Sequence, residues 1–268
     1  MTPVVALTIA GSDSGGGAGI QADLKTFAAH RVYGTSAVTA VTAQHTAAVT
    51  AVVVLDPDLV VAQIDAVTTD LRPAATKTGM LANPAIVAAV AGLAADGALA
   101  NLVVDPVLVS TSGHALMGDG GVEAYRKLLL PRAAVSTPNL REAAALTGRP
   151  LAELTTVDAM ADVAEELRAL GTAVVVVKGG HFAAGGSPDV VAGPDGTVVL
   201  DGERIPTTND HGTGCSLSAA IAANLALGLP PLAAIEQAKA YVARAIAGAR
   251  EWSLGAGHGP IDHFGWTT

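Results

Sequence analysis

Aromatic residues are scarce in this sequence. Phe, Trp and Tyr make up only 3% of its 268 residues, although half of the residues are hydrophobic. The core must therefore be built from Ala, Val, Leu and Ile, a composition that suits β-branched strands covered by Ala-rich helices. A chain of this length can bury a sizeable core, either as one large α/β domain or as two small ones.

Positive charge is also scarce. The chain carries 15 Lys and Arg residues against 24 Asp and Glu residues, which gives a formal net charge of −9. No Lys/Arg run is available to neutralise a phosphate backbone, so we expect no nucleic-acid partner. An acidic protein that handles polyphosphate normally brings a divalent cation to its site.

The sequence lacks a second cysteine and lacks the usual signs of secretion or membrane insertion. Its single cysteine, Cys215, cannot form an internal disulfide, which favours a reducing compartment. Residues 1–10 lack the basic segment of a secretory signal and lead directly into glycines. No apolar stretch reaches the roughly 20 residues of a membrane span without Asp, Gly or Pro. We therefore expect a soluble cytoplasmic protein with no membrane partner.

Short Val/Ala/Leu runs alternate with segments of helical periodicity along the whole chain, a pattern that predicts βαβ units and a parallel sheet. The predicted strands are Val4–Ala10, Ala37–Ala43, Ala51–Leu55, Asn101–Val107 and Ala173–Val177, followed by a hairpin of Val190–Ala192 and Thr197–Leu200. The predicted helices are Ile20–His30, Leu59–Leu71, one from Asn83 to about Gly97, Thr137–Leu146, Thr156–Gly171, and two long ones separated by Pro230 and Pro231. No repeat, low-complexity linker or charge block marks a boundary. We predict a single doubly wound, mostly parallel α/β sheet with helices on both faces, and one domain over residues 1–268.

The most informative segment is His211–Ala220, in which two glycines and the cysteine directly precede a long apolar helical run. The first backbone N–H groups of a helix lack partners and carry partial positive charge, so they attract anions. Gly212 and Gly214, on either side of Thr213, let the backbone approach a phosphate closely. Cys215 falls in the first turn, where the same field favours its thiolate, although a free cysteine is also often a small buried hydrophobe. The segment predicts an anion hole with a candidate base and points to phosphoryl transfer.

A second glycine-rich segment, Gly11–Ile20, follows the first predicted strand and leads into a helix. It departs from the dinucleotide-binding G-x-G-x-x-G pattern because Ile20 stands where the third glycine is required, and no G-x-x-x-x-G-K-[ST] motif occurs in the chain. The chain also lacks H-E-x-x-H and G-x-S-x-G, which argues against a zinc site and against a hydrolase. Four glycines in five positions favour close packing against a ligand over a flexible loop.

Further polar residues follow predicted strands or open a helix. Asp105 ends a strand, where a carboxylate either reaches a metal or substrate or caps the next turn. Asn139 and Glu142 lie three residues apart and share a helix face, which is also an ordinary capping arrangement. Lys178 leaves another strand, where it either meets phosphate or is solvated. The residues alone leave both readings open at each position.

Taken in order, these segments resemble the hydroxymethylpyrimidine/phosphomethylpyrimidine kinases of thiamine biosynthesis, which belong to the ribokinase-like superfamily. The resemblance extends from Ala6 to about Phe264. The motifs that carry it are Ala6-Leu-Thr-Ile-Ala-Gly-Ser-Asp13, Gly16-Gly-Ala-Gly-Ile-Gln-Ala-Asp-Leu-Lys25, Thr42-Ala-Gln44, Lys77-x-Gly-Met80, Asp105-Pro106, Thr137-Pro-Asn139, Lys178-Gly-Gly-His181 and His211-Gly-Thr-Gly-Cys215. Their order and spacing are far more specific than any one of them alone.

The resemblance implies a kinase that transfers the γ-phosphate of ATP in two steps, first to the hydroxymethyl group of 4-amino-5-hydroxymethyl-2-methylpyrimidine and then to the resulting monophosphate. By motif, Gly212, Thr213, Gly214 and Cys215 would form the catalytic loop. We expect Cys215 to take the proton of the substrate hydroxyl, at a position where many ribokinase-like enzymes carry Asp.

The resemblance also assigns roles to the other site residues. Asp23 and Gln44 would hydrogen-bond the aminopyrimidine, because an amino group beside a ring nitrogen requires one acceptor and one donor. The remaining assignments are Gly11, Met80 and Val107 around the pyrimidine, Asn139, Lys178 and Lys239 for ATP, and Asp105 and Glu142 for Mg²⁺. The family resemblance further suggests a homodimer.

Two other functions remain open at this point. Pyridoxal kinase is the nearer alternative, because relatives with the Gly-Thr-Gly-Cys motif phosphorylate that vitamin. The pair of Asp23 and Gln44 favours an aminopyrimidine over pyridoxal. A non-catalytic sensor that binds the pyrimidine alone is the second alternative, and the intact glycines and Cys215 argue against it.

Overall fold

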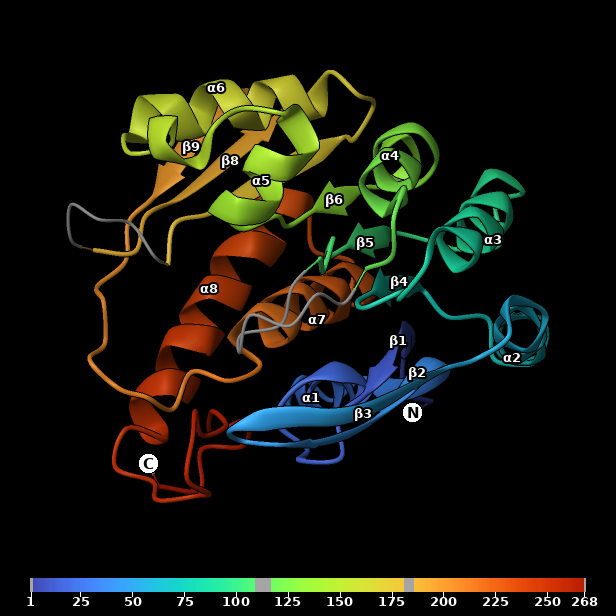
Figure 1. The fold of residues 1–268 in the computed structure, drawn as a ribbon, viewed down its shortest axis with the longest axis horizontal. Helices are drawn as coiled ribbons and strands as arrows, with labels where there is room; N and C mark the ends of the chain where they lie inside the picture. Colours follow the sequence, from blue (N-terminus) through green and yellow to red (C-terminus); the bar gives the residue numbers. More distant parts are fainter. Residues whose placement is uncertain (1, 109–116, 181–185, 268) are drawn as a thin grey trace.

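The fold is built on one sheet. The computed structural model describes residues 2–108, 117–180 and 186–267, and within these residues nine strands pair in the order β3-β2-β1-β4-β5-β6-β7-β8-β9 (Figure 1). The strands are β1 (Val5–Ser12), β2 (Tyr33–His45), β3 (Ala48–Val54), β4 (Ala75–Thr78), β5 (Leu102–Val104), β6 (Val135–Ser136), β7 (Val174–Lys178), β8 (Asp189–Gly193) and β9 (Gly196–Leu200). The helices are α1 (Gly19–Ala29), α2 (Pro57–Asp70), α3 (Pro84–Ala95), α4 (Gly121–Ala124), α5 (Leu140–Thr147), α6 (Val157–Arg168), α7 (Thr213–Ala226) and α8 (Pro231–Gly248).

The centre of the sheet is parallel and both edges are antiparallel. Strand β1 pairs in parallel with β2 on one side and with β4 on the other, and parallel pairing continues through β5 and β6 to β7. Strands β3, β8 and β9 add antiparallel edges, which confirms the predicted hairpin near residues 190–200. Because the chain moves outward from β1 in both directions, the β1/β4 boundary is a topological switch point, where such sheets bind ligands at their carboxyl ends.

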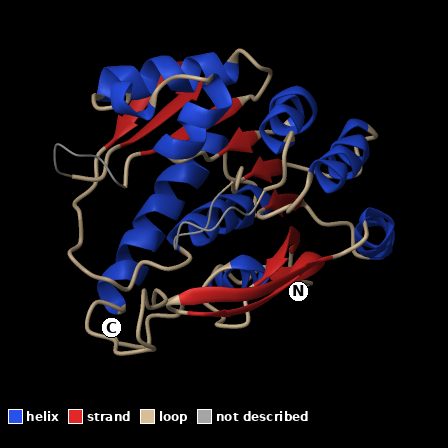
Figure 2. Cartoon of the chain, viewed as in Figure 1, coloured by secondary structure: helices blue, strands red, loops and turns tan. Residues whose placement is uncertain are grey.

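Helices cover both faces of the sheet, as predicted (Figure 2). Helices α1, α7 and α8 pack on one face, and α2, α3, α5 and α6 pack on the other. Alternate residues of a strand serve the two faces: Leu7 and Ile9 of β1 join the core that contains α3 residues, whereas Ala6, next to Leu7, joins the core that contains α7 residues. This two-sided burial explains why the strands read as nearly continuous hydrophobic runs.

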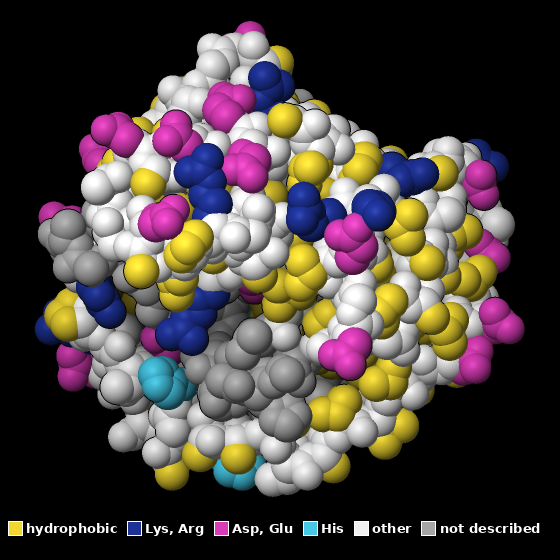
Figure 3. All heavy atoms as spheres, turned by 45° about the horizontal axis from the view of Figure 1, so that its top comes forward, with side chains coloured by type: hydrophobic (Ala, Val, Ile, Leu, Met, Phe, Trp, Pro, Cys, Tyr) yellow, Lys and Arg dark blue, Asp and Glu magenta, His cyan; other side chains and the backbone are white. Residues whose placement is uncertain are grey.

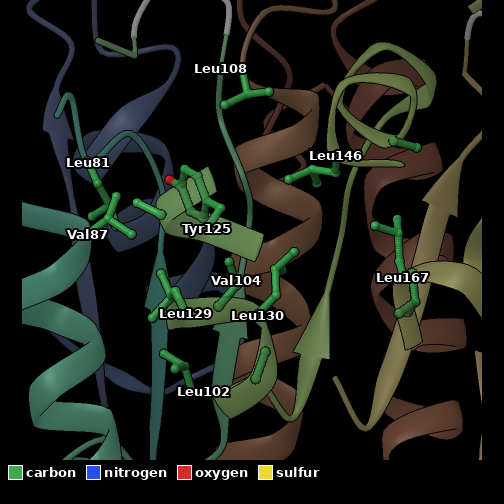
Figure 4. Close-up of a cluster of buried hydrophobic side chains, with 14 of the residues drawn as sticks. Leu81, Val87, Leu102, Val104, Leu108, Tyr125, Leu129, Leu130, Leu146 and Leu167 are labelled. Atoms are coloured by element: carbon green, nitrogen blue, oxygen red, sulfur yellow. The ribbon is translucent and has the colours of Figure 1, made fainter. Parts of the chain in front are cut away.

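The core is aliphatic, as the composition requires. Figure 4 shows leucines and valines packed around Tyr125, the single aromatic side chain among the described residues of this cluster. Each fully buried Leu or Val contributes roughly 1.5–3 kcal/mol to folding, so many medium-sized side chains replace a few large rings.

Several helix ends follow the expected capping chemistry. The Asn83 side chain accepts a hydrogen bond of 2.9 Å from the Ile86 amide, and Pro84 occupies the first helical position of α3. Thr156 caps α6 in the same way, by accepting from the Ala159 amide at 3.1 Å. Helix α5 begins at Leu140 with Asn139 as its N-cap, so the predicted start at Thr137 was wrong by three residues.

Some elements differ from the sequence prediction. Strand β5 covers Leu102–Val104 rather than Asn101–Val107, because Pro106 has no N–H to donate to the ladder. Helix α6 ends at Arg168, short of Gly171. The short strands β4 and β6 and the helical segment 121–132 were not predicted, and residues 249–267 are mostly irregular.

The described surface is mixed in charge. On the face shown in Figure 3, acidic and basic side chains are interspersed with hydrophobic ones rather than gathered by sign. Among the described residues, no helix combines the length and apolar character needed to span a membrane.

Candidate functional site

A cavity of about 740 Å³ opens at the carboxyl ends of the central strands and at the N-terminus of α7. It collects residues that are far apart in the sequence. The residues predicted for the site that line it are Gly11, Gln44, Met80, Val107, Asp105, Asn139, Glu142, Lys178, Lys239, Gly212, Thr213, Gly214 and Cys215. Asp23, also predicted for the site, is absent from this lining.

Helix α7 points its N-terminus into the cavity, as the glycines suggested. Gly212 is the N-cap and has a φ of +84°, a conformation that L side chains rarely adopt. A Cβ at this position would also overlap the carbonyl oxygen of Gly17. Gly214 leaves room for Lys178, because an added Cβ would lie 3.3 Å from the Lys178 Nζ. The first-turn amides of Gly214 and Cys215 and the Lys178 ammonium therefore face the same space, while the Thr213 amide donates to the Asp210 carbonyl.

Cys215 lies in this first turn, but its ionisation differs from the expectation. Burial raises the pKa of Cys215 to about 11, and the nearby Lys77 ammonium opposes this only in part. The negative charges of Asp23 and Asp105 push the pKa in the same direction as burial. The predicted preference for the thiolate was therefore wrong, because desolvation outweighs the helix field.

Asp23 lies beneath the cavity rather than on its wall. Its carboxylate is fully buried and accepts two hydrogen bonds from the Lys77 ammonium, at 3.0 and 2.9 Å, and one from the Thr8 hydroxyl at 2.6 Å. The prediction that Asp23 touches the pyrimidine is corrected, because both of its oxygens already have partners inside the protein. Lys77 lines the cavity in its place. Burial lowers the pKa of Lys77, but the neighbouring acidic groups, Asp23 first among them, together outweigh burial and hold that pKa above its usual value.

Asp13, to which the sequence analysis gave no role, organises the glycine-rich loop. One carboxylate oxygen accepts from the Gly15 amide at 2.8 Å, and the other accepts from the Gly17 and Ala18 amides at 3.1 and 2.8 Å. The second oxygen also lies 2.9 Å from the His211 Nε2. Both side chains line the cavity. The sequence does mark both residues, since Asp13 ends the first family motif and His211 begins the last one.

Gln44 also lines the cavity, next to the same histidine. Its amide group lies between the Thr42 hydroxyl, at 3.3 Å, and the His211 Nε2, at 3.4 Å. Gly11 leaves room for Met80, because a Cβ at Gly11 would overlap the Met80 side chain. Amide groups beside an apolar methionine suit a flat heteroaromatic ring with a polar edge.

Asp105 is buried at the end of β5 and accepts three hydrogen bonds. The donors are Lys178 at 3.0 Å, Thr137 at 3.2 Å and Ser218 of α7 at 3.3 Å. The negative charge of Asp105 also reaches Glu142, where burial first and Asp105 second raise the pKa to about 7 against the opposing effect of Lys178. Two carboxylates that repel each other in a buried site suit a cation placed between them.

The capping alternative for Asn139 and Glu142 is correct, and it does not remove them from the cavity. The Asn139 side chain accepts from the Glu142 amide at 3.0 Å, and Glu142 accepts from the Asn139 amide at 2.8 Å, which is a complete capping box. Both residues line the cavity as well. Among the described residues, no group of three or more His, Cys, Asp or Glu side chains could hold a metal ion by itself. A metal here would therefore need further ligands from a substrate or from water.

Lys239 reaches the cavity from α8 but already has protein partners. Its ammonium donates to the Asp189 carboxylate at 2.6 Å and to the Ser187 carbonyl at 2.8 Å. It joins α8 to the start of β8, a structural contact that the sequence did not reveal. His181, the last residue of the Lys178 motif, lies outside the described residues.

Comparison with known proteins agrees with this geometry. Residues 13–262 match the family model described as phosphomethylpyrimidine kinase. The chain is 51% identical over 261 residues to the hydroxymethylpyrimidine/phosphomethylpyrimidine kinase of Rhizobium meliloti (strain 1021), with 97% of each chain covered. It is 43% identical over 264 residues to the enzyme of the same name from Escherichia coli (strain K12), with 98% of each covered.

Solved structures share the fold along nearly the whole chain. An ADP complex of Bacillus subtilis pyridoxal kinase superimposes with a TM-score of 0.88 at 39% identity and covers 98% of both chains. Phosphomethylpyrimidine kinase from Clostridium difficile 630 gives a TM-score of 0.80 at 41% identity, covering 91% of this chain and 99% of that one. The ribokinase-like fold expected from the sequence is thereby confirmed. Since the family model spans nearly all of its length, the chain belongs to the phosphomethylpyrimidine kinase family.

Proposed function

We propose that this protein uses ATP to phosphorylate 4-amino-5-hydroxymethyl-2-methylpyrimidine and then its monophosphate, in thiamine biosynthesis. The observation that carries this proposal is the joint lining of one cavity by a helix N-terminus with free amides and by the polar edge around Gln44. Membership of the phosphomethylpyrimidine kinase family supports the same reaction. A kinase needs mainly to position two substrates and to stabilise the charge of the phosphoryl group in flight.

The phosphoryl group would sit over the first turn of α7. The amides of Gly214 and Cys215 supply donors there without side-chain obstruction from Gly212 or Gly214, whereas the Thr213 amide donates to the Asp210 carbonyl. Lys178 adds positive charge, because Asp105, with which it pairs, and Glu142 and Cys215 together outweigh burial and raise its pKa. Preorganised donors of this kind are worth most where water is excluded.

Cys215 is our candidate for the proton acceptor. As the substrate oxygen bonds to the γ-phosphorus and the bond to ADP breaks, the hydroxyl proton would pass to the Cys215 sulfur. A pKa of about 11 means that only a small fraction of the protein carries the reactive thiolate at neutral pH. That small fraction is a strong base, and Lys77 supplies the positive charge that steadies it.

The pyrimidine would lie against Gln44, with Met80 and Val107 on its apolar side and Gly11 leaving the space for Met80. Gln44 offers both a donor and an acceptor to the ring edge. Asp23 would act on the site through Lys77, since that ammonium stands between it and the cavity.

The nucleotide would extend toward Asn139, Lys178 and Lys239, and Mg²⁺ would bind near Asp105 and Glu142. The fit is good for a metal that shares its coordination with phosphates, because the protein offers two buried carboxylates and few other ligands. When bound, Mg²⁺ would neutralise phosphate charge. Lys178 would orient the phosphate, and the capping box would hold Glu142 at the entry of α5.

We also propose a cytoplasmic homodimer. Strand β3 is a sheet edge, and it carries exposed valines on its surface, among them Val53, which is 62% exposed. Val41 of the neighbouring strand is 48% exposed, and Tyr33 is 55% exposed. A second copy that covered these side chains would remove both the apolar surface and the free edge from water.

The test is to incubate the protein with ATP, Mg²⁺ and the pyrimidine alcohol and to follow mono- and diphosphate by mass. We expect the monophosphate first and the diphosphate later. Pyridoxal is the matched alternative substrate, because pyridoxal kinases from Bacillus subtilis and Staphylococcus aureus share this fold. A higher kcat/KM for pyridoxal would replace the proposed substrate, and calorimetric binding of the pyrimidine without turnover would indicate a sensor. Cys215→Ala should lower kcat by about 10²–10⁴-fold, the range for a lost general base.

A further inference from the structure

Two loops from opposite ends of the chain meet at the wall of the cavity. Residues 13–18 lie between β1 and α1, and residues 210–212 lead directly into α7. Their backbones touch, because a Cβ on Gly212 would overlap the Gly17 carbonyl oxygen and a Cβ on Gly17 would overlap the His211 ring. A larger residue at Gly212 would have to separate the two backbones, and a larger residue at Gly17 would have to displace the His211 ring.

The Asp13 carboxylate holds the two loops together. It accepts three backbone amides of its own loop and the His211 side chain, and it is only 3% exposed, against 14% for His211. Burial favours the neutral acid, but the hydrogen bonds from His211 and the backbone outweigh it and hold the pKa of Asp13 below its usual value. The carboxylate is therefore ionised, and the His211 Nε2 must carry the hydrogen that points to it.

His211 touches both halves of the cavity. Its Nε2 lies 3.4 Å from the Gln44 side chain, at the edge proposed for the pyrimidine. Its own backbone is joined directly to Gly212, the N-cap of the anion hole. Ser14 joins the glycine-rich loop to the backbone of the same edge. Its hydroxyl accepts from the backbone N–H of Gln44 at 2.7 Å and donates to the backbone carbonyl of Gln44 at 2.8 Å.

We propose that Asp13 and His211 are positioning residues that couple the two substrate sites, so that the bound pyrimidine strengthens the binding of ATP. This inference rests on the proposed function, because it assigns the Gln44 edge to the pyrimidine and the α7 amides to the phosphates. A ring seated against Gln44 restricts the His211 side chain, and His211 then fixes Gly212 and the amides that follow it. Coupling of this kind is reciprocal, so ATP should strengthen pyrimidine binding by the same factor.

Calorimetry can measure this coupling without turnover. A non-hydrolysable ATP analogue with a methylene bridge between the β and γ phosphates is titrated with Mg²⁺, with and without saturating pyrimidine alcohol. The ratio of the two Kd values is the coupling factor, for which we expect about tenfold in the wild-type protein, within the usual range for coupled sites. His211→Ala should bring the factor below about twofold, whereas His211→Gln, which keeps an N–H donor for Asp13, should retain part of it.

His258→Ala is the matched control. His258 also pairs with an aspartate, Asp210, at 2.7 Å, but its side chain is 55% exposed and does not line the cavity. We expect this variant to keep the wild-type coupling factor. A merely structural role for His211 would lower stability and both affinities while leaving their ratio unchanged.

The outcomes are decisive in each direction. A wild-type factor of one, a wild-type factor retained in His211→Ala, or an equal loss in His258→Ala would overturn the proposal. If His211→Ala does not fold, His211→Phe keeps a ring against Gly17 without the donor and must show the lost coupling. Failure of both variants to fold would make the pair a stability element and also overturn the proposal. If the wild-type protein binds the analogue but neither binds nor phosphorylates the pyrimidine, the proposed function has failed instead.

Discussion

The titration of Cys215 is the sharpest prediction, because the chain contains no other cysteine. A cysteine in water has a pKa of about 8.5, so about one thiol in ten is ionised at pH 7.5. With a pKa of about 11, about one Cys215 in 3,000 is ionised at that pH, a decrease of roughly 300-fold. Only the thiolate reacts with an alkylating reagent, so the folded protein should react slowly at neutral pH and faster with each step toward alkaline pH.

The assay is the rate of iodoacetamide labelling between pH 7 and pH 10.5, read by mass on the intact chain. Cys215 is partly exposed and lines the cavity, so a small reagent reaches it. The shape of the profile reports ionisation, while its height also depends on access. The same chain in urea is the matched control and should reach its plateau near the ordinary thiol pKa. A midpoint below about pH 9 in the folded protein would refute the argument that burial outweighs both Lys77 and the helix field.

The raised pKa of Cys215 also predicts how kcat/KM depends on pH. If Cys215 accepts the hydroxyl proton, kcat/KM should rise with pH from neutral to about 10, because this quantity reports ionisation of the free enzyme. Lys77 stays protonated in this window, since its pKa is raised by Asp23, and it will not mask the effect. A profile that is flat above pH 8 would mean that another group takes the proton.

Three further predictions concern backbone, charge and metal. Gly212→Ala should lower both activity and the free energy of unfolding, because the added Cβ meets the Gly17 carbonyl at a φ of +84°. The control Gly92→Ala, in open space on helix α3, should instead stabilise the protein by about 0.5–1 kcal/mol. Equal urea midpoints for the two variants would contradict this prediction. Asp23→Asn should lower the free energy of unfolding in urea by about 3–5 kcal/mol, because it leaves the Lys77 cation buried without its partner. The double variant Asp23→Leu with Lys77→Met should recover most of this loss. An Asp23→Asn variant as stable as the wild type would be inconsistent with the buried pair. Chelation of Mg²⁺ should abolish turnover and leave the unfolding midpoint unchanged, and activity that survives the chelator would exclude the proposed metal.

Most of the fold could be predicted because two-sided burial leaves a plain signal in the sequence. The run Val174–Val177 reads as a strand without any knowledge of its neighbours, and Asn83 with Pro84 marks a helix start by chemistry alone. Strand β4, Ala75–Thr78, gave no such signal. Two of its residues are threonines and one is Lys77, and it is buried only because β1 and β5 flank it. Tertiary context, rather than local preference, determines such a strand.

The site divides in a similar way into features with local causes, which could be predicted, and features with distant causes, which could not. Residues that follow strand ends, such as Asp105 and Lys178, were expected to converge because parallel strands bring their carboxyl ends together, and they line one cavity. The pKa of Cys215 depends instead on how much water the fold excludes, and on charges brought from α1 and β4. The sequence places Cys215 at a helix end, which favours a thiolate, and gives no measure of the desolvation that reverses this preference.

Asp23 shows what a closer use of helical periodicity would have detected. It lies four residues before Phe27 on α1, and the buried residues of this helix, Ala22, Asp23, Thr26 and Phe27, form the stripe that packs on the sheet. A carboxylate on that stripe is covered by its own helix, so it needs a buried cation rather than a ligand from solvent. Asp13, on the loop before the helix, is not constrained in this way, and it is the aspartate of this motif that reaches the cavity wall. Asp23 shares a helix face with Phe27 and Asp13 does not, and this difference can be read from the residue spacing in the sequence alone.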